Sequence, residues 1–318
     1  MRIGTRASAL ALAQAEQVAA LLGGGEIVPV VTKGDRGEAS EDKSRWVAEL
    51  ESALAGGQLD LAVHSAKDLP GELAEGLALV GTPPRRGAED VLCGARGVEA
   101  LTPGARVGTS SIRRRAQLAA AREDLDVVSM RGNVDTRLAK LAAGQVDALV
   151  LARAGLERLR REDAIDAVLD PARFVPAPGQ GTLALEARAQ DAPVREALAG
   201  ICDAEAFCCL RAERALADAL QASCHTPIGA HAVPWDGGLR LRAWVGLPDG
   251  SAWIGDELTG AAGDPEGLGR EAAARMQLAG ADEILAARMQ LAGAMTARAS
   301  TAVLLARGAG DVDPDGGR

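Results

Sequence analysis

The sequence is poor in aromatic residues and in lysine. Its 318 residues include no tyrosine, two phenylalanines and four tryptophans, so a core must be built from leucine, valine, isoleucine and alanine. Lysine occurs only at Lys33, Lys43, Lys67 and Lys140. Nearly all positive charge is therefore arginine, whose planar guanidinium binds carboxylates in bidentate fashion better than an ammonium group does. The alanine, arginine and glycine bias also follows from genomic base composition, so by itself it indicates no function.

Other absences exclude whole classes of protein. No segment approaches the length that spans a bilayer, and polar residues interrupt residues 9–22, so we expect neither a secretory leader nor a membrane helix. The net charge of −9 argues against non-specific nucleic-acid binding. The odd number of cysteines, five, is not typical of a protein held together by disulfide bonds. The histidines and cysteines form no metal-ligand spacing, so we expect no metal and a cytoplasmic location.

The length predicts two or three domains, because one hydrophobic core of 318 residues would be unusually large. Apolar periodicity predicts a helix over 9–22 and strands over 27–31, 59–63, 77–81 and 90–93. A second alternation of strands and helices covers 105–161, which favours a sheet with helices on its faces. A long helix over 203–220, alternating stretches at 239–245 and 251–258 and a last helix predict a small third domain.

Two local patterns point to a ligand. Strand 59–63 ends in His64 to Asp68, and ligands gather at the carboxyl ends of strands in open α/β sheets. Residues 106–115 and 131–140 are basic, and Thr109, Ser110 and Ser111 open a helix, where free backbone N–H groups favour anions. Positive clusters on an acidic protein suit a small anionic ligand.

Cys224 lies in Gln221–Gly229, where small residues, a proline and a glycine predict a tight loop that fixes the direction of a thiol. Taken alone, such a cysteine is more often a small buried hydrophobic residue. Asp68 before Leu69-Pro70 is, taken alone, more often a cap or turn residue.

Six segments together resemble the porphobilinogen deaminase (hydroxymethylbilane synthase) family, in the family's order. They are Arg2–Gln14, Val63–Pro70, Gly108–Arg115, Arg131–Arg137, Pro176–Gly181 and Gln221–Gly229. The resemblance implies an α/β fold: two α/β domains similar to type II periplasmic-binding domains, plus a small C-terminal α+β domain. The implied boundaries are 1–84 with 182–200 for domain 1, 87–178 for domain 2, 203–306 for domain 3 and 307–318 for a disordered tail.

The resemblance also implies a reaction. Four porphobilinogen molecules are condensed head to tail with loss of ammonia, giving linear hydroxymethylbilane. A dipyrromethane cofactor, held by a thioether to Cys224, primes the chain. Asp68 is the expected catalytic residue, because a carboxylate near the pyrrole N–H stabilises the positive charge left when ammonia departs.

The resemblance further implies which residues bind the cofactor and which bind the substrate. Those for the cofactor are Cys224, Lys67, Ser65, Thr109, Ser110, Ser111, Arg113, Arg114, Arg131 and Asn133. Those for the substrate are Arg6, Ser8, Gln14, Arg137 and Arg158. We expect no nucleic-acid or membrane partner, a monomer, and transfer of the product to a uroporphyrinogen-III synthase.

The sequence departs from the family at two places. Ala222-Ser223 replace two glycines before the cysteine, and the loop around Lys43–Trp46 is shorter than the family's glycine-rich stretch. These departures keep two alternatives open: a non-catalytic two-lobed module that binds an anionic small molecule, and an inactive homologue.

Overall fold

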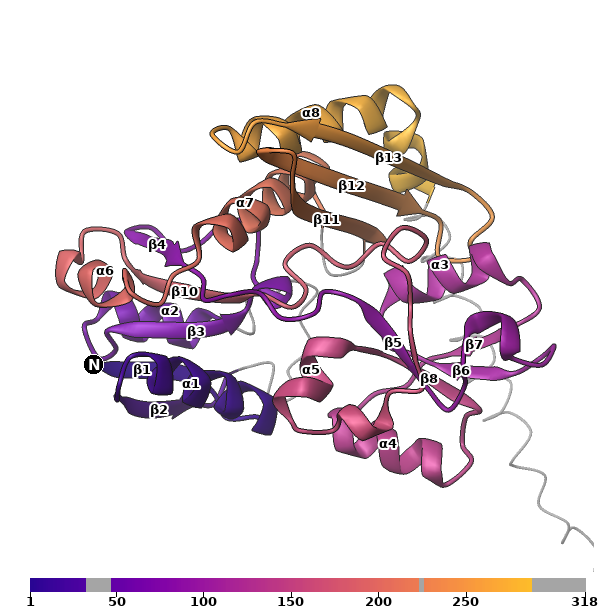
Figure 1. The fold of residues 1–318 in the computed structure, drawn as a ribbon, viewed down its shortest axis with the longest axis horizontal. Coiled ribbons are helices and arrows are strands. Elements are labelled where there is room, and N and C mark those ends of the chain that lie inside the picture. Colours follow the sequence, from indigo (N-terminus) through magenta and orange to yellow (C-terminus); the bar gives the residue numbers. More distant parts are fainter. Residues whose placement is uncertain (33–46, 223–225, 288–318) are drawn as a thin grey trace, which may run out of the picture.

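The computed structural model describes residues 1–32, 47–222 and 226–287, which form three β-sheets with helices packed against them (Figure 1). The first sheet contains β1 (Arg2–Arg6), β2 (Glu26–Val30), β3 (Leu61–Ser65), β4 (Leu77–Gly81) and β10 (Leu183–Arg188), in the order β2-β1-β3-β10-β4. Its helices are α1 (Ala9–Leu21), α2 (Ala48–Ala55) and α6 (Ala192–Leu198). β1 pairs in parallel with β2 and β3, whereas β10 is antiparallel to β3 and β4.

Helix α1 begins where the sequence predicts. The Ser8 side chain caps it by accepting a hydrogen bond from the Ala11 N–H at 3.3 Å, which satisfies one of the free donors of the first turn. Further along the helix, Ala15 and Val18 are fully buried against the first sheet, where they pack with Ile3. This packing brings the N-terminus of α1 close to the carboxyl end of β1.

The second sheet contains β5 (Asp90–Cys93), β6 (Arg106–Gly108), β7 (Asp126–Val128), β8 (Ala148–Ala152) and β9 (Ala167–Val168), in the order β7-β6-β8-β5-β9. Its helices are α3 (Ile112–Ala121), α4 (Val134–Ala142) and α5 (Arg153–Arg158). Separate apolar clusters cover the sheet, one around Leu92 and Val150 and the other around Val91 and Leu149. Since neighbouring residues of a strand point to opposite faces, both faces of this sheet are buried.

The third sheet is antiparallel and consists of β11 (Ile228–Trp235), β12 (Gly238–Gly246) and β13 (Trp253–Gly260). Its helices are α7 (Ala204–Ala219) and α8 (Pro265–Leu278). Alternate residues of β11, including Ile228, Ala230 and Ala232, pack into one core with Leu216 of α7 and Met276 of α8. The predicted fold class is thus confirmed: two mixed α/β sheets and a small C-terminal sheet with helices.

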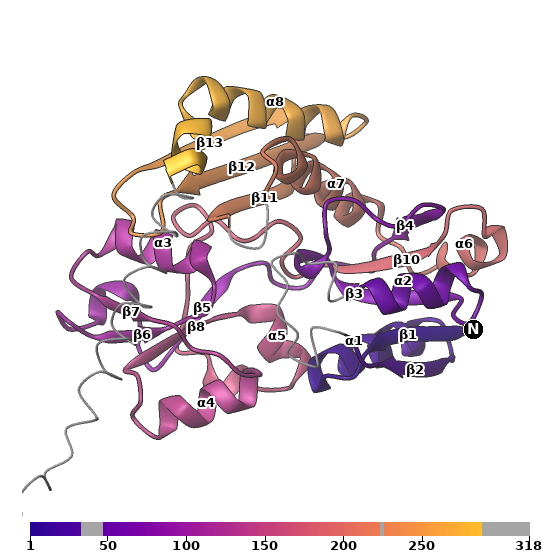
Figure 2. The same ribbon diagram turned by 180° about the vertical axis from the view of Figure 1, so that it is seen from behind.

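Two crossing segments, residues 82–89 and 175–182, connect the first and second sheets. Arg86 donates its N–H to the Gly181 carbonyl at 3.2 Å where the segments meet. Gly181 has a φ of +86°, and a Cβ there would lie 2.4 Å from the Arg86 oxygen. Glycine is therefore required at this point, which explains the Gly-Gln-Gly of the Pro176–Gly181 segment. Figure 2, from behind, shows α5 beside α1, between these two sheets.

Candidate functional site

A cavity of about 50 Å³ lies at the carboxyl end of β3. Asp68 ends the short 3₁₀ turn Ala66–Asp68 that follows this strand, and it lines the cavity. Five predicted site residues share it, and they come from two stretches that are distant in sequence, residues 6–14 and 65–68. The complete lining is Arg6, Ser8, Leu10, Ala11, Gln14, Val47, Val63, His64, Ser65 and Asp68.

Two of these residues hold each other in place. Gln14 is 2% exposed, and its side-chain nitrogen donates to the Ser65 hydroxyl at 2.8 Å. The bond ties α1 to β3, so the two side chains form one wall of the cavity. Ser8 already accepts a backbone hydrogen bond as the helix cap, and its hydroxyl proton stays available for a ligand.

His64, one of the residues that line the cavity, forms a buried pair with Glu186 that the sequence did not reveal. His64 Nε2 lies 2.8 Å from Glu186 Oε2, and the two side chains are 4% and 0% exposed. β3 and β10 bring them together across the first sheet. No local pattern predicts this contact, because the two strands are far apart in the chain.

Lys67 connects the first sheet electrostatically with the second. Burial lowers its pKa to about 8, although Asp68 next to it acts in the opposite direction. The Arg114 and Arg113 charges also lower this pKa, and Asp90 raises it. Asp90 begins β5 and the two arginines lie on α3, so charges of the second α/β unit act on the pKa of Lys67.

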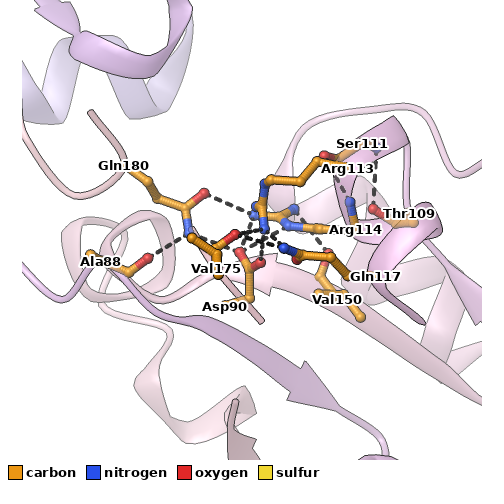
Figure 3. Close-up of polar contacts among 10 residues, drawn as sticks. All are labelled: Ala88, Asp90, Thr109, Ser111, Arg113, Arg114, Gln117, Val150, Val175 and Gln180. Atoms are coloured by element: carbon orange, nitrogen blue, oxygen red, sulfur yellow. Dashed lines mark hydrogen bonds and ion pairs between the residues drawn. The ribbon is translucent and has the colours of Figure 1, made fainter. Parts of the chain in front are cut away.

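Arg113 and Arg114 are 3% and 7% exposed, and both pair with Asp90 (Figure 3). Arg113 Nη1 lies 2.7 Å from Asp90 Oδ2, and Arg114 Nε lies 2.9 Å from Asp90 Oδ1. Burial would raise the pKa of Asp90, but the two guanidinium charges outweigh it and hold that pKa well below its ordinary value. Asp90 was missed in the sequence, where it precedes the apolar Val91–Cys93 as an ordinary first residue of a strand.

Two of the predicted polar residues, Ser111 and Asn133, are helix caps. Ser111 accepts a hydrogen bond from the first turn of α3 at 3.5 Å and donates its own N–H to Thr109 Oγ1 at 3.2 Å. Asn133 caps α4 at 2.8 Å. Ser110 is exposed just before α3. The caps leave the remaining N–H groups of each helix start directed outward, where they favour an anion.

The other predicted arginines lie around this centre. Arg137 donates to the Gly132 carbonyl at 2.8 Å, and its pKa is lowered by burial and by the charge of Arg114. Arg158 donates to the Gly181 carbonyl at 2.8 Å, and burial followed by the Arg86 charge lowers its pKa. Arg131 is exposed.

The four described cysteines are core residues. Cys93 and Cys209 belong to apolar clusters, and Cys202 and Cys208 pack against such clusters. Burial raises the pKa of Cys93 to about 11 and that of Cys209 to about 12, and it also raises the pKa of Cys202. A thiol with a raised pKa is a poor nucleophile at neutral pH. Cys224 lies outside the described residues, between α7 and β11.

No group of three or more His, Cys, Asp or Glu side chains within residues 1–32, 47–222 and 226–287 is arranged to hold a metal ion. No helix in the same ranges is long and apolar enough to cross a membrane. The predicted tail 307–318 and the loop around Lys43–Trp46 fall outside the described residues.

Family models and curated relatives agree on one family. The model described as "Porphobilinogen deaminase, dipyromethane cofactor binding domain" matches residues 1–196, and "Porphobilinogen deaminase, C-terminal domain" matches residues 207–277. Porphobilinogen deaminase of Deinococcus radiodurans is 44% identical over 299 residues, covering 89% of this chain and 97% of the relative. That of Thermus thermophilus is 44% identical over 292 residues, with the shares 89% and 97%.

Solved structures show a weaker likeness. The BvgS VFT2 domain of Bordetella pertussis is 18% identical, with a TM-score of 0.36, and the match covers 63% of this chain and 85% of that one. A putative methionine-binding lipoprotein of Bacillus subtilis is 11% identical, with a TM-score of 0.38 and coverage of 63% and 89%. These similarities are too low to support a statement about ligands.

Proposed function

Since the chain belongs to the porphobilinogen deaminase family, we propose that it condenses four porphobilinogen molecules head to tail, with loss of ammonia, to give linear hydroxymethylbilane. One observation carries the proposal. Asp68 shares its cavity with Arg6, and the charges of Arg113 and Arg114 on α3 act on the pKa of the adjacent Lys67. The Asp68 carboxylate thus has cations of both α/β units in its neighbourhood, which suits a substrate that bears several carboxylates and develops positive charge on its ring.

Asp68 serves as the catalytic group. Loss of ammonia from the aminomethyl carbon leaves an electron-poor azafulvene, and a carboxylate beside the pyrrole N–H stabilises that positive charge. The same carboxylate can receive and return a proton at the pyrrole nitrogen. Lys67, the residue before Asp68, supplies a positive charge that attracts the carboxylates of the substrate.

The residues present fit a dipyrromethane cofactor. Arg113 Nε and Arg158 Nε are buried nitrogens without a hydrogen-bond partner among the described residues, and carboxylate side chains of pyrroles would supply acceptors for them. When bound, the dipyrromethane supplies the nucleophilic pyrrole carbon that begins the chain. The residues that would hold it are Ser65, Lys67, Thr109, Ser110, Ser111, Arg113, Arg114, Arg131 and Asn133.

We infer attachment at Cys224. The other four cysteines sit in or against apolar clusters, and three of them have raised pKa values, so they are poorly suited to act as the nucleophile. A thioether at Cys224 needs only that its thiolate attack an azafulvene, which this enzyme generates itself.

Further features are carried over from the family. Arg6, Ser8, Gln14, Arg137 and Arg158 are the proposed substrate-binding residues. The proposed domains are 1–84 with 182–200, then 87–178, then 203–306. We also infer a cytoplasmic monomer that passes its product to a uroporphyrinogen-III synthase.

The first experiment is the denatured intact mass of the purified protein, followed by peptide mapping. An excess equal to two pyrrole units on the Cys224 peptide, together with ammonia release from added porphobilinogen, is the expected result. The Cys224→Ser variant is the matched control and should carry no pyrrole mass and give no colour with Ehrlich's reagent.

Two other outcomes separate the alternatives. A protein that stays bare and releases no ammonia after incubation with porphobilinogen, yet binds it, is the two-lobed binding module. A protein that carries the two pyrrole units but releases no ammonia is an inactive homologue.

A further inference from the structure

Asp90 is a buried carboxylate that joins three parts of the chain. It begins β5 and is 1% exposed. Oδ2 accepts a hydrogen bond from Arg113 Nη1 at 2.7 Å, and Oδ1 accepts one from Arg114 Nε at 2.9 Å. Oδ1 also accepts one from Gln180 Nε2 at 2.8 Å (Figure 3). Asp90 therefore connects β5, α3 and the crossing segment 175–182.

The cluster around Asp90 remains positively charged. Two guanidinium groups face one carboxylate, and arginine stays protonated at any physiological pH. Lys67, whose pKa is affected by the charges of these three side chains, adds a further positive charge at pH 7. A closed ion pair would be neutral, whereas this arrangement attracts a second anion.

The hydrogen bonds that hold the Arg113 guanidinium all come from one nitrogen, Nη1. Nη1 alone donates to Asp90, to Gln117 Oε1 at 3.0 Å and to the Val175 carbonyl at 2.8 Å. Nε, on another edge of the same guanidinium, is buried without an acceptor among the described residues. Because a guanidinium is planar and rigid, fixing one corner fixes the direction of the remaining N–H groups.

Arg114 is held in a similar way. Nε bonds Asp90, Nη1 donates to the Val150 carbonyl at 3.1 Å, and Nη2 lies 3.4 Å from Gln180 Oε1. The Gln180 amide is itself fixed, since its nitrogen donates to the Ala88 carbonyl at 2.6 Å. Asp90 is thus an acceptor that both arginines share.

We propose that Asp90 is a positioning residue that holds Arg113 and Arg114 in the orientation in which they receive the carboxylates of the pyrrole chain. The inference rests on the proposed function. Asp90 acts through the arginines and does not touch the pyrroles, because its two oxygens are already occupied by protein donors.

The Asp90→Asn variant tests whether Asp90 orients the arginines, because asparagine keeps the size of the side chain at this position. The amide oxygen must take the Oδ1 place, where two donors converge, so the amide NH₂ then faces Arg113 Nη1. Two donors facing each other in a buried place repel, and Arg113 turns away while Arg114 keeps its acceptor. We therefore expect Asp90→Asn to behave like Arg113→Gln.

The test is a double-mutant cycle with two readouts: the KM for porphobilinogen, and the fraction of protein that carries the mass of two pyrrole units. Each single variant should raise KM by about tenfold and lower the loaded fraction, with kcat of the loaded protein changed by less than about threefold. The double variant should be no worse than Arg113→Gln alone, because Asp90 acts through that side chain.

Asp90→Glu is the second variant, and it keeps a buried anion beside the arginines if the asparagine variant fails to fold. It moves the carboxylate by one methylene, so a positioning role predicts a raised KM here too. Leu92→Ala, a core truncation on the same strand, is the control that lowers stability without moving KM or loading.

Three results would overturn the proposal: unchanged KM and loading in Asp90→Asn, full rescue in Asp90→Glu, or additive effects in the double variant. The proposed function fails differently. In that case the unaltered protein itself carries no pyrrole mass and releases no ammonia from porphobilinogen.

Discussion

Glu213 on α7 forms a buried ion pair with Arg85 in the crossing segment 82–89. Arg85 Nη1 lies 2.7 Å from Glu213 Oε1, and the two side chains are 13% and 0% exposed. The same carboxylate accepts the backbone N–H of Gly179 at 2.6 Å and that of Ala232 at 2.7 Å. One side chain of the C-terminal unit therefore fixes both crossing segments and the middle of β11.

Replacing Glu213 by glutamine should destabilise the protein by about 3 kcal/mol or more, because it leaves Arg85 buried beside a neutral amide. Urea unfolding followed by circular dichroism measures the change. Glu266→Gln is the matched control. Glu266 on α8 pairs with Arg211, which lies on α7 like Glu213, but both side chains of this pair are partly exposed. Such a pair is worth less than about 1 kcal/mol. Equal losses in the two variants would contradict the prediction.

A second prediction concerns the end of α7, just before Cys224. Gln221 has a φ of +49°. Two backbone hydrogen bonds end the helix: the Gln221 N–H donates to the Asp218 carbonyl and the Ala222 N–H donates to the Ala217 carbonyl, each at 2.9 Å. This is a Schellman motif, whose left-handed position favours glycine. Gln221→Gly should therefore stabilise the protein by about 0.5–1 kcal/mol.

Thermal unfolding of Gln221→Gly beside Gln221→Ala gives the measurement. Alanine keeps the left-handed strain, so it should show no gain. A glycine variant that melts no higher than the alanine variant would show that the strain at this position is already relieved.

The helices and strands were predictable where periodicity is local. Strands 77–81 and 90–93 have the predicted limits, and helix 9–22 ends one residue earlier. Strand β11 was not predicted, because glycine, alanine and Pro234 dilute its pattern. It forms since its residues pair in register with β12 and pack against α7.

The site residues, like the helices and strands, were predictable only where the signal is local in the sequence. The resemblance of short segments named Asp68 together with Arg6, Ser8, Gln14 and Ser65, and these five residues line one cavity. It could not predict Asp90, Glu186 or Glu213, because each meets its partner through tertiary packing rather than through spacing. Buried counter-charges carry no signature in the sequence, since an acidic residue next to an apolar run is also an ordinary strand or helix end.

The lowered pKa of Lys67 predicts how the stability of the protein changes with pH. Its pKa of about 8 in the folded chain is below the ordinary value of about 10.4, so the folded state binds fewer protons than the unfolded state between these values. Stability from this group therefore rises as the pH increases from about 8 to about 10, by up to about 3 kcal/mol. Pyrrole carboxylates beside Lys67 would keep it charged and remove the rise.

The rise is measured as the free energy of unfolding against pH in Cys224→Ser, which carries no cofactor, with Cys224→Ser/Lys67→Met as the reference. The two curves should converge above pH 10 and separate below pH 8, with the lysine protein less stable there. Parallel curves would place the Lys67 pKa at its ordinary value, and Lys67 would then lie in water rather than within reach of the arginine charges.

The last prediction concerns Asp68. Asparagine keeps its size and its hydrogen-bonding shape but removes the charge that stabilises the azafulvene, so Asp68→Asn should lower kcat by about 100-fold or more. Ammonia release from porphobilinogen measures the loss. The melting temperature should change little, because Asp68 is only half-buried at the cavity. Glu72→Gln, which alters an exposed carboxylate between Asp68 and β4, is the control that should keep kcat. A kcat near that of the unaltered protein in Asp68→Asn would transfer the catalytic role to another group of the cavity.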